Sequence, residues 1–243
     1  MHHKKAVDIS GLMYTYPDAI KALDDVSLCV HAGEKVAVIG PNGAGKSTLL
    51  MHMNGILNGT GSVIIGGIEV KKSTLKQVRK LVGFVFQNPE DQLFSATVFD
   101  DIAFGLIQFG LPKDTIHKKV EEVLEHTGIQ GIENRSPFRL SYGQQKMAAL
   151  ATVLVLDPHI LVLDEPGSNL DPKHRRKLLD FLKNDPTTIV IATHDLDFAA
   201  ELCDRTLILY NGKIVADGKS RDILSDKPLL EKYDLELPLG SYY

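Results

Sequence analysis

Short apolar runs rich in β-branched residues recur along the chain and are typical of buried strands. They lie at 35–40, 81–86, 160–164 and 188–194. Near the N-terminus, weaker alternation on either side of a turn at 16–18, followed by a glycine turn inside 61–70, predicts a small antiparallel layer. Within 207–215, Asn211-Gly212 is a strong signal for a two-residue hairpin turn.

Other segments carry their apolar residues at helical spacing. Residues 46–57 and 114–127 each gather them on one face, whereas 141–156 is apolar on almost every side and is expected to be a buried helix. Further helices are expected from 97 to about 110 and from about 172 onward. Strands that alternate with helices in this way predict an α/β fold with a mostly parallel sheet.

The helices between 89 and 158 interrupt that alternation. We interpret this interval as a helical subdomain inserted into a core made of 1–88 and 159–243, with the antiparallel layer beside the core. The whole chain, 1–243, is then a single domain. It shows no internal repeat and no low-complexity segment.

Between the strand at 35–40 and the helix at 46–57 lies Gly40-Pro-Asn-Gly-Ala-Gly-Lys-Ser-Thr48, which matches the pattern G-x-x-x-x-G-K-[ST]. Its glycines let the backbone curl until several N–H groups converge on one point, and the helix N-terminus adds further amides. A phosphate chain is the natural occupant, and an accidental glycine-rich turn fits the strand–turn–helix context poorly. Lys46 is expected to reach the outer phosphates and Ser47 to ligate Mg²⁺. The candidate nucleotide-binding residues here are Asn42, Gly43, Ala44, Gly45, Lys46, Ser47 and Thr48.

Two carboxylates follow the buried strand at 160–163. Asp164 and Glu165 should emerge at its C-terminal end, where α/β sheets hold their ligands. Asp164 could hold Mg²⁺ through a water, and Glu165 could polarise a water for in-line attack on a γ-phosphate. A surface turn that merely carries two acids is the alternative, and the apolar run before them argues against it.

Weaker candidates end other strands or begin a helix. Gln87 could reach Mg²⁺ or the attacking water, and His194 could hydrogen-bond the γ-phosphate, although either could be purely structural. Ser141 with Gln144 forms a capping box, and Gly143 leaves the first helical turn uncluttered for an anion. A well-capped core helix would show the same local pattern.

Composition narrows the function classes. The 243 residues are 44% hydrophobic and 24% charged, as in ordinary globular proteins, and 27 basic against 31 acidic residues give a net charge of −4. Nucleic acid is therefore not indicated, and the basic cluster 173–177 is expected to be a solvated helix face. Cys29 and Cys203 are too few for a disulfide framework or a zinc site. Neither a signal peptide in the first residues nor an apolar run long enough to span a membrane is present.

Taken together, these motifs resemble the nucleotide-binding cassette of the ATP-binding cassette (ABC) family over essentially the whole chain. Residues 40–48 are similar to its Walker A loop, 160–165 to its Walker B strand, 140–144 to its signature and 168–171 to its D-loop. The resemblance implies a P-loop NTPase core of the RecA type that uses ATP and Mg²⁺. In that family Glu165 would be the general base, while Gln87 and His194 would sense the γ-phosphate. Adenine would stack on Tyr16, with Tyr14 a weaker candidate, and the implied magnesium ligands are Ser47, Gln87 and Asp164.

The resemblance also implies a head-to-tail dimer with an identical or paralogous chain. ATP on one Walker A loop would be closed over by Ser141, Gly143 and Gln144 of the other copy, with Asp171 of the D-loop nearby. Tyr142 departs from this pattern, because the signature usually has glycine there. We expect its side chain to point away from the phosphates, and its effect on the hydrolysis rate is open.

A narrower resemblance comes from 86–94 followed by 98–105, which are similar to the energy-coupling-factor importers. The family role of Glu90, Asp91 and Gln92 is to engage an arginine-bearing coupling helix of the transmembrane subunit, which links the cassettes indirectly to a substrate-binding membrane subunit. A solvated acidic turn is the alternative for each residue. The signature region with 148–154 is more similar to the cobalt/nickel branch than to the vitamin branch.

The implied function is an ATP-hydrolysing subunit, peripheral on the cytoplasmic face of the cell membrane, that energises import of cobalt or nickel ions. A vitamin importer remains open. So does a soluble ABC ATPase such as an iron–sulfur assembly factor, which should lack the segment 89–94. DNA-repair types need a long coiled-coil insertion, and translation types carry two cassettes in tandem. A small-molecule kinase would need neither Glu165 nor a signature.

Overall fold

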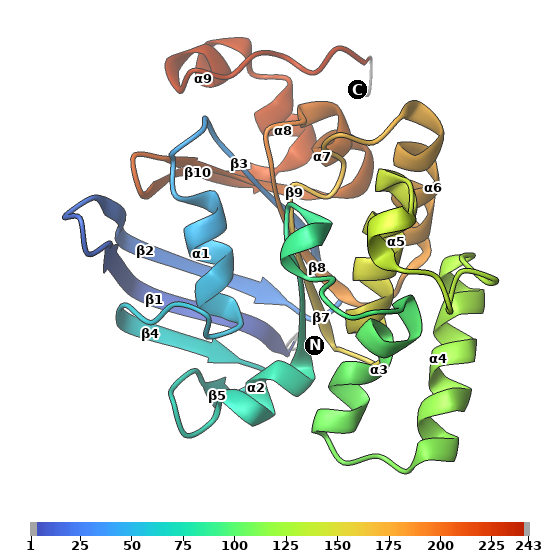
Figure 1. Cartoon of the computed structure of the whole chain (residues 1–243). Coiled ribbons are helices and arrows are strands. Elements are labelled where there is room, and N and C mark those ends of the chain that lie inside the picture. The colour runs from blue at the N-terminus through green and yellow to red at the C-terminus, as the bar shows by residue number, and fades with distance from the viewer. Residues whose placement is uncertain (1–3, 241–243) are drawn as a thin grey trace.

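The computed structural model describes residues 4–240, which form two sheets with helices packed between and around them (Figure 1). The antiparallel sheet has the order β2-β1-β4-β5, with β1 (Lys5–Thr15), β2 (Lys21–His31), β4 (Thr60–Ile65) and β5 (Ile68–Glu69). The second sheet has the order β10-β9-β3-β8-β7-β6, with β3 (Lys35–Ile39), β6 (Val82–Val85), β7 (Ile160–Asp164), β8 (Thr188–Thr193), β9 (Arg205–Tyr210) and β10 (Lys213–Lys219). The predicted α/β fold, with a mostly parallel sheet and a small antiparallel layer, is confirmed.

The second sheet is buried on both faces because its inner strands are apolar at nearly every position. In β3, Ala37 and Ile39 face a cluster formed with the surrounding helices, whereas Val36 and Val38 face the antiparallel sheet. From β9 to β6 the paired strands run parallel, and only β10 is antiparallel to its neighbour. The carboxyl ends of β3, β8, β7 and β6 therefore meet at one edge.

Helix α1 (Lys46–Met53) lies between the two sheets (Figure 1). Leu49, Leu50 and Met53 are completely buried in the cluster that joins it to both sheets. The helix is shorter than the predicted 46–57, because Asn54 ends it and Gly55 follows with a φ of 67°. This packing fixes the start of α1 at the edge where the parallel strands end.

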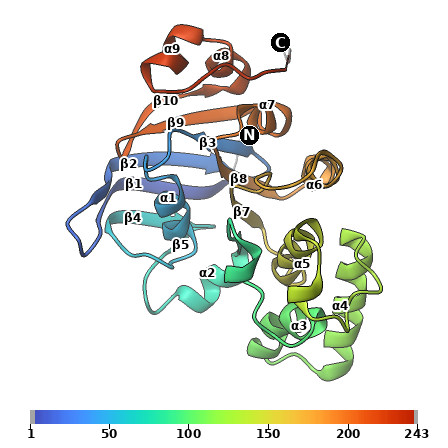
Figure 2. The same cartoon turned by 45° about the horizontal axis from the view of Figure 1, so that its top comes forward.

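The interval 89–158 is helical and projects to one side of the sheets (Figure 2). It contains the short 3-10 turns η1 (Pro89–Asp91) and η2 (Pro137–Arg139) and the helices α3 (Val98–Gln108), α4 (Lys113–Thr127) and α5 (Tyr142–Leu154). Thr97 caps α3 by accepting from the Asp100 N–H at 3.1 Å. Gly128, at a φ of 64°, ends α4. The helices expected at 97–110, 114–127 and 141–156 are thus present, within a few residues of their predicted ends.

The remaining helices complete the core. Residue Asp171 caps α6 (Pro172–Asn184), which was expected from about 172. The patterns did not predict α2 (Leu75–Leu81), α7 (Leu196–Leu202), α8 (Ser220–Leu224) or α9 (Lys227–Lys232). Each spans two turns or fewer, too short for a helical period to show in the sequence. Helices α8 and α9 cover the end of the molecule nearest β10 (Figure 2).

Within residues 4–240, no helix combines the length and the apolar character needed to cross a bilayer. The expectation that the chain starts without a signal peptide depends partly on residues 1–3, which lie outside the described residues.

Candidate active site

One open cavity of about 620 Å³ lies at the edge where β3, β8, β7 and β6 end. Eleven of the residues singled out in the sequence line it: Tyr16, Asn42, Gly43, Ala44, Gly45, Lys46, Ser47, Thr48, Gln87, Glu165 and His194. They come from segments far apart in the chain. The fold therefore brings the phosphate-binding loop together with the three polar strand ends, as the sheet rule predicted.

The loop at 40–48 is held in its curled shape by glycines and by distant backbone. Gly45 has a φ of 104°, and a Cβ placed there would lie 2.4 Å from the Ala22 carbonyl oxygen. The N–H of Gly212, in the β9–β10 turn, donates to the Ala44 carbonyl at 3.0 Å, while the Gly212 carbonyl accepts from the Asp24 N–H at 2.9 Å. The antiparallel sheet and the β9–β10 turn thus both brace the loop.

Lys46 is 7% exposed, and its side chain is held by the first residues of the loop. Its Nζ donates to the Gly40 carbonyl at 2.7 Å and to the Pro41 carbonyl at 3.1 Å. Burial lowers the pKa of this ammonium, and the carboxylates of Glu165 and Asp164 oppose that shift. A buried cation beside converging backbone N–H groups is suited to bind the outer phosphates of a nucleotide.

Asp164 is buried next to Ser47, one of the residues that line the cavity, and the oxygen atoms of these two side chains suit a divalent cation. Burial raises the pKa of its carboxyl, while a hydrogen bond from Ser47 lowers it. Its Oδ1 is buried and finds no hydrogen-bond partner among residues 4–240. An oxygen without a partner, next to a serine hydroxyl, fits the oxygen-rich shell of a hydrated Mg²⁺. Gln87, the third predicted ligand, lines the cavity.

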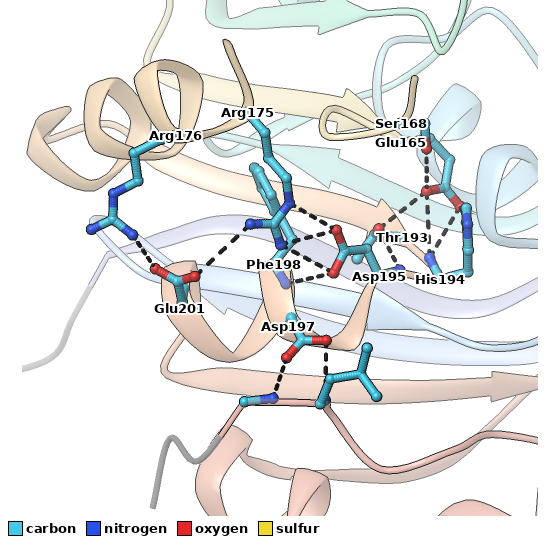
Figure 3. Close-up of polar contacts among 12 residues, drawn as sticks. Glu165, Ser168, Arg175, Arg176, Thr193, His194, Asp195, Asp197, Phe198 and Glu201 are labelled. Carbon is cyan, nitrogen blue, oxygen red and sulfur yellow. Dashed lines mark hydrogen bonds and ion pairs between the residues drawn. The ribbon is translucent and has the colours of Figure 1, made fainter. Parts of the chain in front are cut away.

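Glu165 and His194 face each other across the ends of β7 and β8 (Figure 3). His194 Nδ1 lies 2.8 Å from Glu165 Oε1, and the His194 backbone N–H also donates to that oxygen at 3.1 Å. The hydroxyls of Thr193 and Ser168 donate to Oε2 at 3.1 and 3.2 Å. The carboxylate is only 7% exposed, whereas the imidazole is 59% exposed, so Nδ1 is turned to the acid and the rest of the ring to the cavity.

A second set of contacts supports His194 from behind. Asp195 caps α7 by accepting from the Phe198 N–H at 2.8 Å, and Arg175 donates to both of its carboxylate oxygens at 3.0–3.2 Å (Figure 3). Arg175 also stacks over the Phe198 ring. The prediction that 173–177 is simply a solvated face is therefore wrong for Arg175, which joins α6 to the residue after His194.

Of the two tyrosines, only Tyr16 reaches the cavity. Its hydroxyl lies 2.9 Å from Thr48 Oγ1, which ties the aromatic ring to the phosphate-binding loop. Tyr14 packs edge-on against Tyr16 and against the buried His52. Tyr16 is thus the better placed of the two for stacking a base, and Tyr14 supports it.

The signature-like residues lie apart from this cavity. Ser141 and Gln144 form the predicted capping box at the start of α5, with bonds of 3.1 and 3.3 Å. A Cβ at Gly143 would lie 2.6 Å from the His174 ring, and His174 Nδ1 is 2.5 Å from Asp171 Oδ2. Asp171 itself caps α6. These residues do not line the chain's own cavity, so their predicted contact with a nucleotide needs a second copy.

The acidic turn after Gln87 is divided between surface and interior. Glu90 and Asp91 are exposed, as a contact with a partner requires. Gln92 turns inward: its Nε2 donates to the Ala149 carbonyl at 2.8 Å and to Thr152 Oγ1 at 2.7 Å. Its Oε1 accepts from the Phe86 N–H at 3.2 Å. The expectation that Gln92 engages a partner is corrected, because its amide already joins η1 to α5.

Sequence patterns missed several side chains that hold the site together. They are Lys146, Arg175, Thr193 and Asp195. Asp195 had a usable signal, because an Asp directly before a short apolar helix is a good N-cap. Lys146 had none, since its partners come from segments far away in the chain.

Comparison with known proteins shows which family has this sequence and fold. The model of the ABC transporter family matches residues 23–168. The energy-coupling factor transporter ATP-binding protein EcfA of Methanocaldococcus jannaschii is 43% identical, over 96% of this chain and 85% of its own length. Among solved structures, cbiO1 of Clostridium perfringens, part of the ABC transporter complex cbiONQ, is 35% identical with a TM-score of 0.82 and 94% coverage of both chains. The ATP-binding cassette MJ0796, solved as a dimer bound to ADP and Pi, is 30% identical with a TM-score of 0.81, covering 88% of this chain and 99% of its own.

Proposed function

This chain belongs to the ABC transporter family, and from that premise we propose that it powers uptake of cobalt or nickel ions through an energy-coupling-factor importer. It is an ATPase of the energy-coupling-factor type, and its hydrolysis of ATP is coupled to transport. The choice of cobalt or nickel is supported by the likeness to cbiO1 of the cbiONQ complex. As such a subunit, the chain is expected on the cytoplasmic face of the membrane, held there by its partners.

The observation that carries the proposal is the single cavity shared by the phosphate-binding loop, Gln87, Glu165 and His194. Lys46 and the loop amides would hold the phosphates of ATP, and the Tyr16 ring would carry the adenine. In hydrolysis a water attacks the γ-phosphorus, and the bond to the β-phosphate oxygen breaks on the far side. Glu165 would accept the proton of that water, because its carboxylate is oriented by four contacts and lines the same cavity as the phosphate-binding loop.

Mg²⁺ would be held by Ser47 Oγ, by Asp164 through a water and by the Gln87 amide. The unpartnered Asp164 Oδ1 is the feature of the site that this assignment satisfies. Once bound, the ion would neutralise charge on the β- and γ-phosphate oxygens. His194 would add a hydrogen bond to the γ-phosphate while its Nδ1 stays on Glu165.

A second copy, identical or paralogous, would close the site. The first turn of α5, which follows Ser141 and includes Gly143, presents backbone N–H groups without helical partners. Such a helix N-terminus is suited to bind an anion. That end lies outside the chain's own cavity, so in a head-to-tail pair it would cover the nucleotide of the neighbour. The dimeric MJ0796 cassette supports this arrangement.

The membrane subunit would dock where the acidic turn meets exposed aromatic residues. Glu90 and Asp91 begin this surface, and Phe94 and Phe104 continue it as an exposed edge-to-face pair, with centroids 5.2 Å apart. Phe94 is 63% exposed and Phe104 is 44% exposed. Acidic side chains beside exposed aromatic rings suit a segment that carries arginine, which can pair with the carboxylates and stack on the rings.

Charge reversal at Glu90 and Asp91 is expected to weaken recovery of the membrane subunits in co-purification. Each substitution to Lys replaces an attraction for an arginine with a repulsion, while the phosphate-binding loop is untouched. Nucleotide binding should stay at the level of the unmodified chain. Reversal at Glu121 and Glu122, exposed on α4, is the matched control and should leave recovery unchanged. Full recovery with the Glu90 and Asp91 variants would remove the acidic turn from the docking surface.

Transport itself tests the proposed substrate. The membrane complex purified with this chain is placed in vesicles and supplied with ATP, and the uptake of Co²⁺, Ni²⁺ or a vitamin is measured. We expect ATP-dependent accumulation of cobalt or nickel, and none without ATP. Accumulation of a vitamin but of neither metal ion would overturn the proposed substrate and identify a vitamin importer. Failure to recover any membrane subunit would favour a soluble ABC ATPase.

A further inference from the structure

Lys146 is a buried cation that the proposed hydrolysis does not use. It lies in the second turn of α5, only 3% exposed, and its Nζ points to the ends of β6 and β7. It donates to the Gln87 carbonyl at 2.7 Å and lies 3.3 Å from the Glu165 carbonyl and 3.4 Å from the Phe86 carbonyl. One ammonium thus joins the helical subdomain to the backbone of two candidate active-site residues.

Tyr142 lies one helical turn before Lys146, on the same face of α5. Its hydroxyl donates to the same Gln87 carbonyl, at 3.4 Å. This contact directs the ring to the backbone after β6, and the expectation that the side chain points away from phosphate stays a prediction. Tyr142, which stands where the signature usually has glycine, therefore has a hydrogen-bond partner within this chain, the Gln87 carbonyl.

The backbone of Glu165 needs such support. Its φ is 45°, in the left-handed region that a side chain with a Cβ rarely adopts, and this conformation costs about 1–2 kcal/mol. On one side its N–H donates to the Ala192 carbonyl at 2.8 Å. On the other side its carbonyl faces Lys146. A strained residue that is held through both its N–H and its carbonyl keeps one side-chain direction.

We propose that Lys146 and Tyr142 form a clamp by which the start of α5 positions Gln87 and Glu165 for ATP hydrolysis. The inference rests on the proposed roles of Gln87 and Glu165. Both clamp residues act through the backbone, so they are positioning residues. Because α5 begins with the residues proposed to cover the neighbour's nucleotide, the clamp also ties the position of that helix end to the chain's own cavity.

The clamp is tested by steady-state ATP hydrolysis of the Lys146→Met and Tyr142→Phe variants. Methionine keeps the length of the side chain and removes its donors, so kcat should fall about 10- to 100-fold, while the KM for ATP stays within about threefold. Tyr142→Phe removes one weaker donor and should lower kcat about two- to fivefold. Because both donors act on the Gln87 carbonyl, the double variant should lose less than the product of the single losses.

Lys35→Met is the matched control. Lys35 Nζ also donates to two backbone carbonyls, those of Leu182 and Lys183, at 2.7 and 2.6 Å. It begins β3, at the opposite edge of the sheet from the cavity, so its loss should leave kcat unchanged. Turnover by Lys146→Met within about twofold of Lys35→Met would overturn the clamp, as would a KM that rises in parallel with the loss of kcat. Glu165→Gln separates the two ideas: if it hydrolyses ATP normally, the proposed role of Glu165 fails, whatever Lys146 does.

Discussion

Glu165→Gln is expected to bind ATP with near-normal affinity and to hydrolyse it about 10²-fold more slowly or worse, as the loss of a general base does. The amide keeps the size of the carboxylate, so the packing against His194, Thr193 and Ser168 is preserved. It cannot accept the proton of the attacking water. Phosphate release under saturating ATP and Mg²⁺ gives the rate, and a fluorescent ATP analogue gives the affinity.

The same variant should accumulate as an ATP-bound dimer in gel filtration, because the hydrolysis that reopens the pair is blocked. Glu34→Gln is its matched control. Glu34 is also partly buried and bonded, accepting from the His31 N–H at 2.8 Å and lying 3.3 Å from Arg205 Nη1, but it is remote from the cavity. Normal turnover by Glu165→Gln would remove Glu165 from the role of base. A monomer at high ATP would count against the closed pair.

Gly45→Ala is expected to weaken ATP binding about 10²-fold or more, because strain and steric conflict act together on the phosphate-binding loop. The added Cβ would lie 2.4 Å from the Ala22 carbonyl oxygen and 3.2 Å from Leu23 Cδ2, at a φ of 104°. Neither neighbour can yield easily, since Ala22 and Leu23 belong to β2. The loop must shift, and its N–H groups then no longer converge.

Gly67→Ala separates strain from steric conflict. Gly67 has a φ of 89°, but apart from Gly67 itself and its two chain neighbours, no residue within 4–240 has a heavy atom within 4 Å of a Cβ built there. It should lower the free energy of unfolding by about 1–2 kcal/mol and leave nucleotide binding unchanged. Thermal unfolding and titration with a fluorescent ATP analogue measure both effects. ATP binding by Gly45→Ala within a few-fold of the unmodified chain would show that the loop tolerates the shift.

The strand ends were predictable because a parallel sheet imposes a rule on the sequence. Gln87, the pair Asp164 and Glu165, and His194 each follow a buried apolar strand, and parallel strands must deliver such residues to one edge. The structure brings Gln87, Glu165 and His194 together around one cavity, and Asp164 is hydrogen-bonded to Ser47, which also lines it. The phosphate-binding loop was predictable for a related reason, since its glycines and the helix after it form a local pattern. The chemical roles of these residues stay predictions until the variants are measured.

The supporting contacts were not predictable, because no local pattern encodes them. Lys146 reaches the carbonyls of Gln87 and Glu165, which follow two different strands and lie close to α5 only in the folded chain. Gln92 shows the opposite error: its sequence context suggested a partner, but its side-chain amide makes three hydrogen bonds within the chain. Arg175 lies within a run of basic residues, and nothing in that run distinguishes it as the one that pairs with Asp195.

The brace that Gly212 supplies to the phosphate-binding loop has a consequence for biosynthesis. A growing polypeptide that has emerged as far as the start of α7 already contains every residue lining the cavity, yet it lacks the turn that contacts Ala44 and Asp24. We therefore expect nucleotide to be captured only by chains that have been translated past β9. Unfinished products released early would carry the complete motif and still fail to compete for cellular ATP.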